Sequence, residues 1–241
     1  MMACWPLEGQ KLFQDYFDRD FILRPKVVYY SVRIMKNFNF TIVDVETTGG
    51  SALLSRIIEI GILRVEKGEL VSKYKSFINP GTAIPEIITE ITGITNAQVK
   101  KAPCFEDIAE EIFPLFEDSI FVAHNSSFDY GFLRAEFSRA NYVLTMDTLC
   151  TVRLSRVLFP EYKRHNLSAL IDRFDFTCKN RHRAFDDAKV LWDFLRMIEK
   201  EFPPEHVQAA IERTIKKLSP KKQLKLPKVD VPEIVYQAME F

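Results

Sequence analysis

The sequence predicts a mixed α/β domain in which one β-sheet is flanked by helices. Residues 56–80 hold two apolar runs joined by the turn Glu66-Lys67-Gly68-Glu69, which is a hairpin signal. Beyond this hairpin, short apolar runs alternate with longer segments that have helical spacing. Hairpin strands are antiparallel, whereas strands that alternate with helices favour parallel pairing, so together they predict a sheet of mixed direction.

Five strands are expected, each a short apolar run bounded by turn residues. They lie in residues 37–50, in the two halves of 56–80, and in residues 119–125 and 143–149. Helical spacing predicts helices in residues 7–19, 85–91, 96–100, 104–117, 126–141, 151–159, 166–174, 182–202 and 205–218. Pro114 should interrupt one of them, while Ser126 or Ser127 and Asn166 are candidate N-caps.

The length of 241 residues suits one domain with extensions at its ends. We expect a helical N-terminal extension in residues 1–37, the folded domain in residues 38–202, and a C-terminal helix with a basic tail in residues 203–241. Lys plus Arg equals Asp plus Glu at 33 each, which neither indicates nor excludes a nucleic-acid partner.

The four cysteines are scattered and form no C-x-x-C pair, which argues against a zinc site or a disulfide framework. The first residues do not form a basic leader followed by an apolar stretch, and no run is long enough to span a bilayer. These features predict a cytoplasmic protein with reduced thiols and no membrane partner.

Four carboxylates and one imidazole stand in three short blocks with apolar flanks. The blocks are TIVDVETTGG, FVAHNSSFDYGFL and NRHRAFDDAKV, and the five residues are Asp44, Glu46, Asp129, His182 and Asp187. Carboxylates crowded within a few ångströms repel one another, and some must protonate unless cations are present. With two divalent cations, such a cluster becomes a site that cleaves phosphodiesters.

The spacing of these residues brings the carboxylates to one place. Residues two apart in a strand share a face, so Asp44 and Glu46 should project side by side. Asp129 and Asp187 fall at helix starts. His182 precedes Asp187 by five residues, a helical rotation of about 140° from the starting face. His182 is therefore expected on the loop before the helix. An imidazole is the side chain best suited to act as a general base near neutral pH.

Each feature alone has an ordinary alternative. A single D-x-E on a strand is usually a solvated face, and Asp129 could simply cap a helix. His124 is better explained as a structural residue or one at the edge of a substrate site than as a metal ligand. The joint occurrence of the three blocks, each at a strand end or a helix start, favours a catalytic site.

The blocks DVETTG, HNSSFDYGFL and HRAFDDA resemble the three motifs of the DEDDh exonuclease family, which includes the proofreading epsilon subunit of bacterial DNA polymerase III. The resemblance covers about 165 residues and implies that residues 38–202 form an exonuclease domain. It implies a ribonuclease-H-like fold, a five-stranded mixed sheet with one antiparallel strand and flanking helices. It also implies hydrolysis of nucleic acid from the 3′ end to nucleoside 5′-monophosphates.

The family motifs imply roles for individual residues. Two Mg²⁺ or Mn²⁺ ions would be bound by the four carboxylates, those of Asp44, Glu46, Asp129 and Asp187, and His182 would deprotonate the attacking water. The substrate would be contacted by Thr47, Thr48, His124 and Asn125. The segment EITGIT resembles the family loop beside the terminal nucleotide, although Thr92 stands where many relatives have His.

Single-stranded or frayed 3′ ends of DNA are the expected substrate, in proofreading or repair. Trimming of RNA ends is an alternative, and a non-catalytic replisome adaptor is an alternative of another class, which the intact set of five residues opposes. Gln223, Leu224 and Leu226 resemble a peptide that binds the sliding clamp, which would suggest a clamp or DNA polymerase partner. The favoured interpretation of this segment is an ordinary solvated basic tail.

Overall fold

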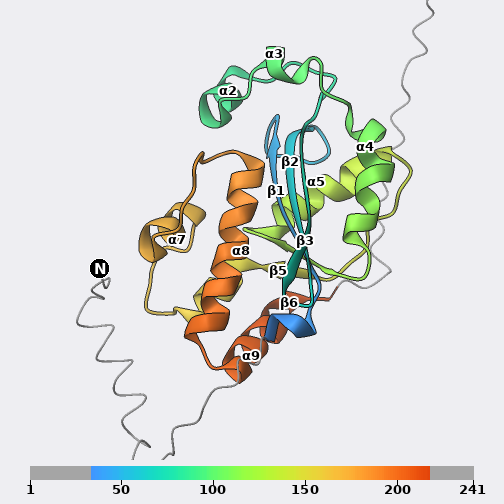
Figure 1. Ribbon diagram of the computed structural model, residues 1–241. Coiled ribbons are helices and arrows are strands. Elements are labelled where there is room, and N and C mark those ends of the chain that lie inside the picture. The colour runs from blue at the N-terminus through green and yellow to red at the C-terminus, as the bar shows by residue number, and fades with distance from the viewer. Residues whose placement is uncertain (1–33, 218–241) are drawn as a thin grey trace, which may run out of the picture. The chain divides into compact units, whose positions relative to one another are not determined.

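The computed structural model describes residues 34–217 of the chain. In this part, six strands form one mixed sheet in the order β3-β2-β1-β4-β5-β6, flanked by helices (Figure 1). The strands are β1 (Phe40–Thr47), β2 (Ile57–Glu66), β3 (Glu69–Phe77), β4 (Ile120–Ala123), β5 (Thr148–Cys150) and β6 (Ile215–Lys216). The predicted mixed α/β architecture is confirmed.

The hairpin of β2 and β3 has the predicted turn. Lys67 and Gly68 both have positive φ, at 51° and 80°. Two consecutive residues of this kind form the hairpin turns whose twist matches that of the flanking strands. The hairpin therefore lies on one side of β1. Its strand β2 pairs antiparallel with β1, and β3 pairs antiparallel with β2.

The sheet has one strand more than the five predicted. β6 pairs antiparallel with β5. Because β4 and β5 are parallel to β1, the two strands β2 and β6 both have the direction opposite to that of β1. β6 has only two residues, too few for a periodic pattern to reveal. The strand predicted over residues 143–149 is wrong in its first half, because the Tyr130 hydroxyl donates to the carbonyl of Leu144 and accepts from the N–H of Met146.

The predicted helices that fall between residues 34 and 217 are present, but the one predicted over residues 205–218 ends at Thr214, directly before strand β6. They are α2 (Glu86–Thr92), α3 (Asn96–Val99), α4 (Phe105–Ile112), α5 (Ser126–Arg139), α6 (Thr151–Leu158), α7 (Leu167–Phe174), α8 (Ala184–Glu201) and α9 (Pro204–Thr214), with short 3₁₀ turns η1 (Ile34–Asn37) and η2 (Phe113–Phe116). Pro114 converts the end of its helix into η2, as expected. The helix predicted in residues 7–19 lies outside the described residues.

One predicted cap is confirmed and one is wrong. The Asn166 side chain accepts the N–H of Ala169 at 2.9 Å and caps α7. The N-cap of α5 is Asn125 rather than Ser126 or Ser127, and its φ of 78° is left-handed. Asn tolerates this conformation better than most residues, which explains why it stands at the sharp turn between β4 and α5.

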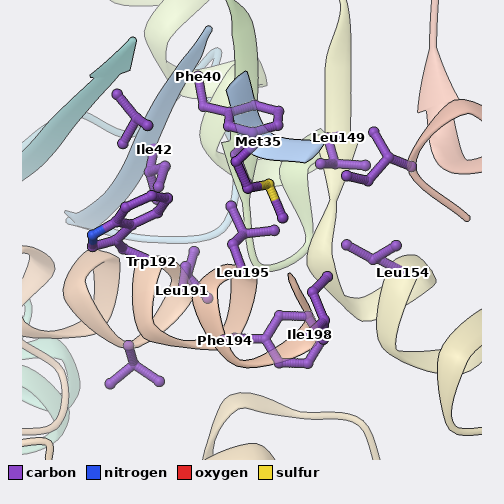
Figure 2. Close-up of a cluster of buried hydrophobic side chains, with 14 of the residues drawn as sticks. Met35, Phe40, Ile42, Leu149, Leu154, Leu191, Trp192, Phe194, Leu195 and Ile198 are labelled. Carbon is purple, nitrogen blue, oxygen red and sulfur yellow. The ribbon is translucent and has the colours of Figure 1, made fainter. Parts of the chain in front are cut away.

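Side chains alternate across β1 and fill a core on each face of the sheet. Phe40 and Ile42 pack against α8, where Leu191 and Leu195 belong to the same cluster (Figure 2). Val43 and Val45 belong to a second cluster, with side chains of α4 and α5. The sheet is therefore a central layer whose first strand is buried on both faces, and it gives a rigid support to the residues that follow.

Helix α9 packs into the first cluster through Val207 and Ile211, so the chain beyond Phe202 still contributes to the core. The domain boundaries proposed from the sequence stay predictions. Between residues 34 and 217, no helix is both long and apolar enough to cross a membrane.

Candidate active site

The carboxyl end of β1 presents Asp44 and Glu46 on one face. Their neighbours Val43 and Val45 are buried in the core on the opposite face, as the strand alternation predicted. In the ladder with β2, Asp44 is opposite Gly61 and Glu46 is opposite Glu59. The strand that carries both carboxylates lies beside β2 and packs against α8 (Figure 1).

Asp187 and His182 approach this pair from the start of α8. One ligand atom each of Glu46, His182 and Asp187 lie within 4.8 Å of one another. Asp187 is only 3% exposed, whereas His182 is exposed and has a φ of 59° on the loop before the helix. The prediction that His182 precedes α8 is therefore confirmed. Its backbone N–H donates to Asp187 at 3.2 Å, which links the loop to the carboxylate.

Asp129 completes the group from the opposite side of the sheet. It lies in the first turn of α5, is 4% exposed, and accepts the N–H of Val45 at 3.3 Å. This bond fixes the start of α5 to the strand that carries Asp44. Because both α5 and α8 begin at the site, the partial positive charges of two helix N-termini favour carboxylates there.

The electrostatics of the group show a deficit of positive charge. Burial, and then the nearby charges of Asp129 and Asp187, raise the pKa of Asp44 well above its ordinary value. Burial and Asp187 raise the pKa of Glu46 to about 8, and burial raises that of Asp129 to about 7. Such carboxylates need cations to stay ionised at neutral pH, and oxygen ligands suit hard divalent ions. The donor set therefore fits a divalent metal site.

Arg181 supplies part of the missing positive charge. Its guanidinium forms an ion pair with the Asp187 carboxylate, and its charge acts to lower the pKa of both Asp44 and Glu46. The Cys178 thiol lies 3.6 Å from the other oxygen of Asp187. Burial and the Asp187 charge raise the pKa of Cys178 to about 11, so this thiol stays neutral beside the carboxylates.

Glu59 is a supporting residue that sequence analysis missed. It is 5% exposed and accepts two hydrogen bonds at 3.1 Å and one at 2.7 Å from the Arg183 guanidinium. It also accepts the N–H of Ala184 at 3.1 Å, which satisfies a free amide at the start of α8. Glu59 thereby holds the residue that follows His182. Its position inside the apolar run IIEIG was the available signal.

Gly61 explains how α8 can start so close to the sheet. A Cβ at this position would lie 2.5 Å from the Cα and the backbone nitrogen of Phe185. A glycine inside a strand often marks such a close backbone approach. This contact sets the distance between Asp187 and the Asp44–Glu46 pair. It was also missed, although a lone glycine in an apolar strand was visible in the sequence.

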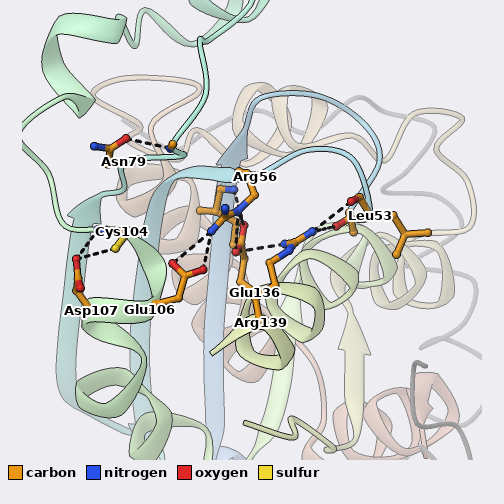
Figure 3. A network of polar contacts seen from close by, with 11 residues as sticks. Leu53, Arg56, Asn79, Cys104, Glu106, Asp107, Glu136 and Arg139 are labelled. Atoms are coloured by element: carbon orange, nitrogen blue, oxygen red, sulfur yellow. Dashed lines mark hydrogen bonds and ion pairs between the residues drawn. The ribbon is translucent and has the colours of Figure 1, made fainter. Parts of the chain in front are cut away.

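Thr47 and Thr48, predicted to contact substrate, order the loop between β1 and β2. The Thr47 hydroxyl donates to the carbonyl of Gly49 at 2.8 Å, and that of Thr48 accepts the N–H of Arg56 at 3.0 Å. Arg56 in turn donates to Glu136, which is fully buried on α5 (Figure 3). The loop is thus fixed to α5. Direct contact of either threonine with substrate stays a prediction.

The other predicted substrate residues lie at the end of β4. His124 Nδ1 is 2.9 Å from the Thr151 hydroxyl, and its buried Nε2 has no partner among residues 34–217. Burial lowers the pKa of His124 to about 4, so its imidazole is neutral. Asn125 forms the left-handed turn into α5.

In the segment EITGIT, the Thr92 hydroxyl donates to the carbonyl of Ile88 and accepts the N–H of Ile94. Gln223, Leu224 and Leu226 lie outside the described residues.

Half-buried carboxylates at the end of the first strand, together with Asp187 and an exposed imidazole from the start of α8, are typical of a metal-dependent hydrolase. The chain belongs to the RNase_T exonuclease family, whose model matches residues 41–195. This match contains all five residues of the three blocks.

Similar proteins are named as nucleases or polymerases. The chain is 34% identical over 185 residues to a PolC-type DNA polymerase III of Streptococcus pneumoniae and 38% identical over 169 residues to the 3′-5′ exonuclease DinG of Bacillus subtilis. These alignments cover 76% and 69% of the chain but only 13% and 18% of the relatives. The chain therefore corresponds to less than a fifth of each relative's length.

Solved structures of exonucleases share the fold. Exonuclease I superimposes with a TM-score of 0.64 at 18% identity, over 71% of this chain and 43% of the other. Exonuclease X in complex with 5′ overhanging duplex DNA gives a TM-score of 0.52 at 26% identity, over 71% of this chain and 99% of the other. The ribonuclease-H-like exonuclease fold expected from the sequence is confirmed.

Proposed function

We propose that the protein is a metal-dependent 3′-5′ exonuclease of the DEDDh type that releases nucleoside 5′-monophosphates from DNA, in proofreading or repair. The observation that carries this proposal is the convergence of Glu46, His182 and Asp187 within 4.8 Å, beside Asp44 and Asp129. These residues come from three separate blocks of the sequence, in the order that the family motifs require.

The carboxylates of Asp44, Glu46, Asp129 and Asp187 would hold two Mg²⁺ or Mn²⁺ ions. Their raised pKa values support this assignment, because carboxylates arranged for a cation repel one another without it. Two such ions neutralise the charge that builds up on the phosphate and on the leaving 3′-oxygen. The protein contributes the fixed geometry: β1 and the starts of α5 and α8 hold the four carboxylates in place before substrate enters.

His182 would take the proton of the attacking water. Its imidazole is exposed, and its ring lies within 4.8 Å of carboxylate oxygens of Glu46 and Asp187. The neighbouring Arg183 is fixed to Glu59 by three hydrogen bonds, which restricts the loop without burying the imidazole. A general base needs this combination of defined position and access to solvent.

DNA is favoured over RNA by the names of the relatives. DinG is named a 3′-5′ exonuclease and another relative is a DNA polymerase, while Exonuclease X was solved with 5′ overhanging duplex DNA. The distinguishing test compares single-stranded DNA, mismatched duplex DNA and RNA, each labelled at the 3′-terminal nucleotide, in Mg²⁺. Faster release of labelled 5′-mononucleotide from DNA supports the proposal. Preferential release from RNA would establish the alternative, and cleavage from the 5′ end would contradict both.

The similarity to PolC-type polymerases also supports action at ends produced by a DNA polymerase. A sliding clamp is the partner that the segment with Gln223, Leu224 and Leu226 would bind, and this is tested by capture of the full chain on immobilised clamp. Loss of binding in Gln223→Ala would support this contact. Equal binding by both proteins, or none by the unmodified chain, would eliminate it.

A further inference from the structure

A basic groove runs along helix α5, whose first turn carries Asp129. Its volume is about 870 Å³, and residues of α5, β5, α6, α9 and β6 line it. Four of the lining side chains are cationic, and no Asp or Glu is among the lining residues within the part of the chain that the structure describes. The cations are Arg134, Arg153, Arg156 and Lys216. In a chain with equal numbers of positive and negative residues, this is a local concentration of positive charge.

Most of these cations are available to a ligand. Arg153, Arg156 and Lys216 are exposed and form no ion pair with a residue between 34 and 217. In contrast, the arginines near the carboxylates are paired, as Arg181 is to Asp187 and Arg183 to Glu59. The groove thus presents unneutralised charge, which favours an anionic ligand.

The groove begins at the same turn of α5 as Asp129. Asn125 and Ser126 line its near end, and Arg134 lies eight residues beyond Ser126 on the helix. At a rise of 1.5 Å per residue, this separation is about 12 Å. Phosphates of one strand of a duplex follow each other every 3.4 Å or so along the axis. A mononucleotide held near Asp129 is too short to reach Arg134, whereas an oligonucleotide is long enough.

No acidic residue follows Lys216 in the sequence until Asp230. Beyond Lys216, the next residues are Lys217-Leu218-Ser219-Pro220-Lys221-Lys222, which add positive charge. The wall includes small or polar residues such as Ser127 and Gly131, and a Cβ at Gly131 would meet no atom within 4 Å. A groove that exposes the three cations Arg153, Arg156 and Lys216 and has no carboxylate among its described lining residues suits a phosphodiester backbone better than an apolar peptide.

We propose that this groove binds the phosphodiester backbone of the substrate outside the nucleotide that is being removed. The inference rests on the proposed exonuclease function and adds a second contact region to it. The backbone could belong to the cleaved strand or to its complement, and the chemistry of the contact is the same for both. Such contacts position the substrate without reading its sequence.

The test uses the full chain with Arg153 and Arg156 both replaced by Ala. The matched control replaces Lys73 and Lys101, two exposed lysines outside the groove, of which Lys73 is on the opposite edge strand β3. Binding of fluorescent single-stranded and duplex oligonucleotides is measured against salt concentration, with EDTA to prevent hydrolysis. Each lost contact to a single strand should reduce the slope of log affinity against log salt by about 0.7.

Turnover provides the second measurement. The double variant should show a several-fold higher KM for oligonucleotides, with an unchanged rate on the nitrophenyl ester of thymidine 5′-monophosphate, which is too short to reach the groove. An effect with one oligonucleotide form or with both supports the proposal and identifies the strand. The same salt slope and KM as the control variant, for both forms, would overturn it. If the unmodified protein hydrolyses neither substrate, the proposed function fails, but the binding measurement still tests the groove.

Discussion

Gly61 of β2 lies directly against the backbone of Phe185 at the start of α8. No side chain fits between them, because even a Cβ would come within 2.5 Å of two backbone atoms. Gly61 is also the ladder partner of Asp44, and Phe185 is two residues from Asp187. One close contact therefore sets the separation between carboxylates from opposite ends of the sequence.

Gly61→Ala should displace the start of α8 and separate the carboxylates. Overpacking of this kind costs about 1–3 kcal/mol of stability, and a displacement of about 1 Å in a catalytic group can reduce the rate about 100-fold. Thermal unfolding and exonuclease turnover measure the two effects. Gly131→Ala is the control for thermal unfolding, because a Cβ there meets no atom within 4 Å and should leave stability equal or higher. Normal activity in Gly61→Ala would show that the contact does not position α8.

The metal-free protein should lose stability as the pH rises. The pKa of Glu46 is raised to about 8 and that of Asp129 to about 7, whereas in an unfolded chain both titrate near pH 4 or so. Between about pH 4 and pH 8, the folded protein therefore retains protons that the unfolded chain releases, so stability falls through this window. Melting temperatures in EDTA should decline, and the increase caused by Mg²⁺ should be larger at about pH 8 than at about pH 5.5. A melting temperature in EDTA that rises across this window would contradict the account.

Removal of the Arg181 charge should make the protein depend more strongly on metal. This guanidinium is paired with Asp187 and acts to lower the pKa of Asp44 and Glu46. Arg181→Gln should therefore lower the melting temperature in EDTA at about pH 8 and increase the gain on adding Mg²⁺. Arg173→Gln is a suitable control, because Arg173 stacks on Tyr162, away from the carboxylates. An equal Mg²⁺ gain in the two variants would refute a role for Arg181 as a counter-charge.

Glu59→Gln should slow the proton transfer to His182 more than it weakens metal binding. Glu59 fixes Arg183 and the first amide of α8 but is not among the proposed ligands. Loss of such an orienting partner typically costs about 10–100-fold in activity. We expect a lower kcat and an altered pH profile, while the Mg²⁺-dependent gain in melting temperature is retained. Glu66→Gln, at the other end of β2, is the control, and equal kcat values for the two variants would exclude a positioning role.

Local patterns predicted the parts of the site that depend on one segment. The alternation in β1 placed Asp44 and Glu46 on one face, and the rotation between His182 and Asp187 excluded a shared helical face. The hairpin turn at Lys67-Gly68 was equally predictable, because short turns are governed by their own residues.

Features that depend on register or on distant partners were not predictable in the same way. Glu59 meets Arg183 across 124 positions, and Arg56 meets Glu136 across 80. Nothing in either segment alone indicates its partner. The position of Asn125 as N-cap was missed because Ser126 and Ser127 have equally good capping side chains, and the left-handed turn decides between them.

The central claim is that Asp187 and its neighbours hydrolyse nucleic acid from the 3′ end. The most direct measurement compares Asp187→Asn with Asp186→Asn on a 3′-labelled DNA oligonucleotide in Mg²⁺. The two aspartates are adjacent, but Asp186 bonds to the Asn180 side chain at 2.9 Å, whereas Asp187 is grouped with Glu46 and His182. The account predicts that only Asp187→Asn abolishes release of the labelled 5′-mononucleotide. Full activity in Asp187→Asn would contradict it.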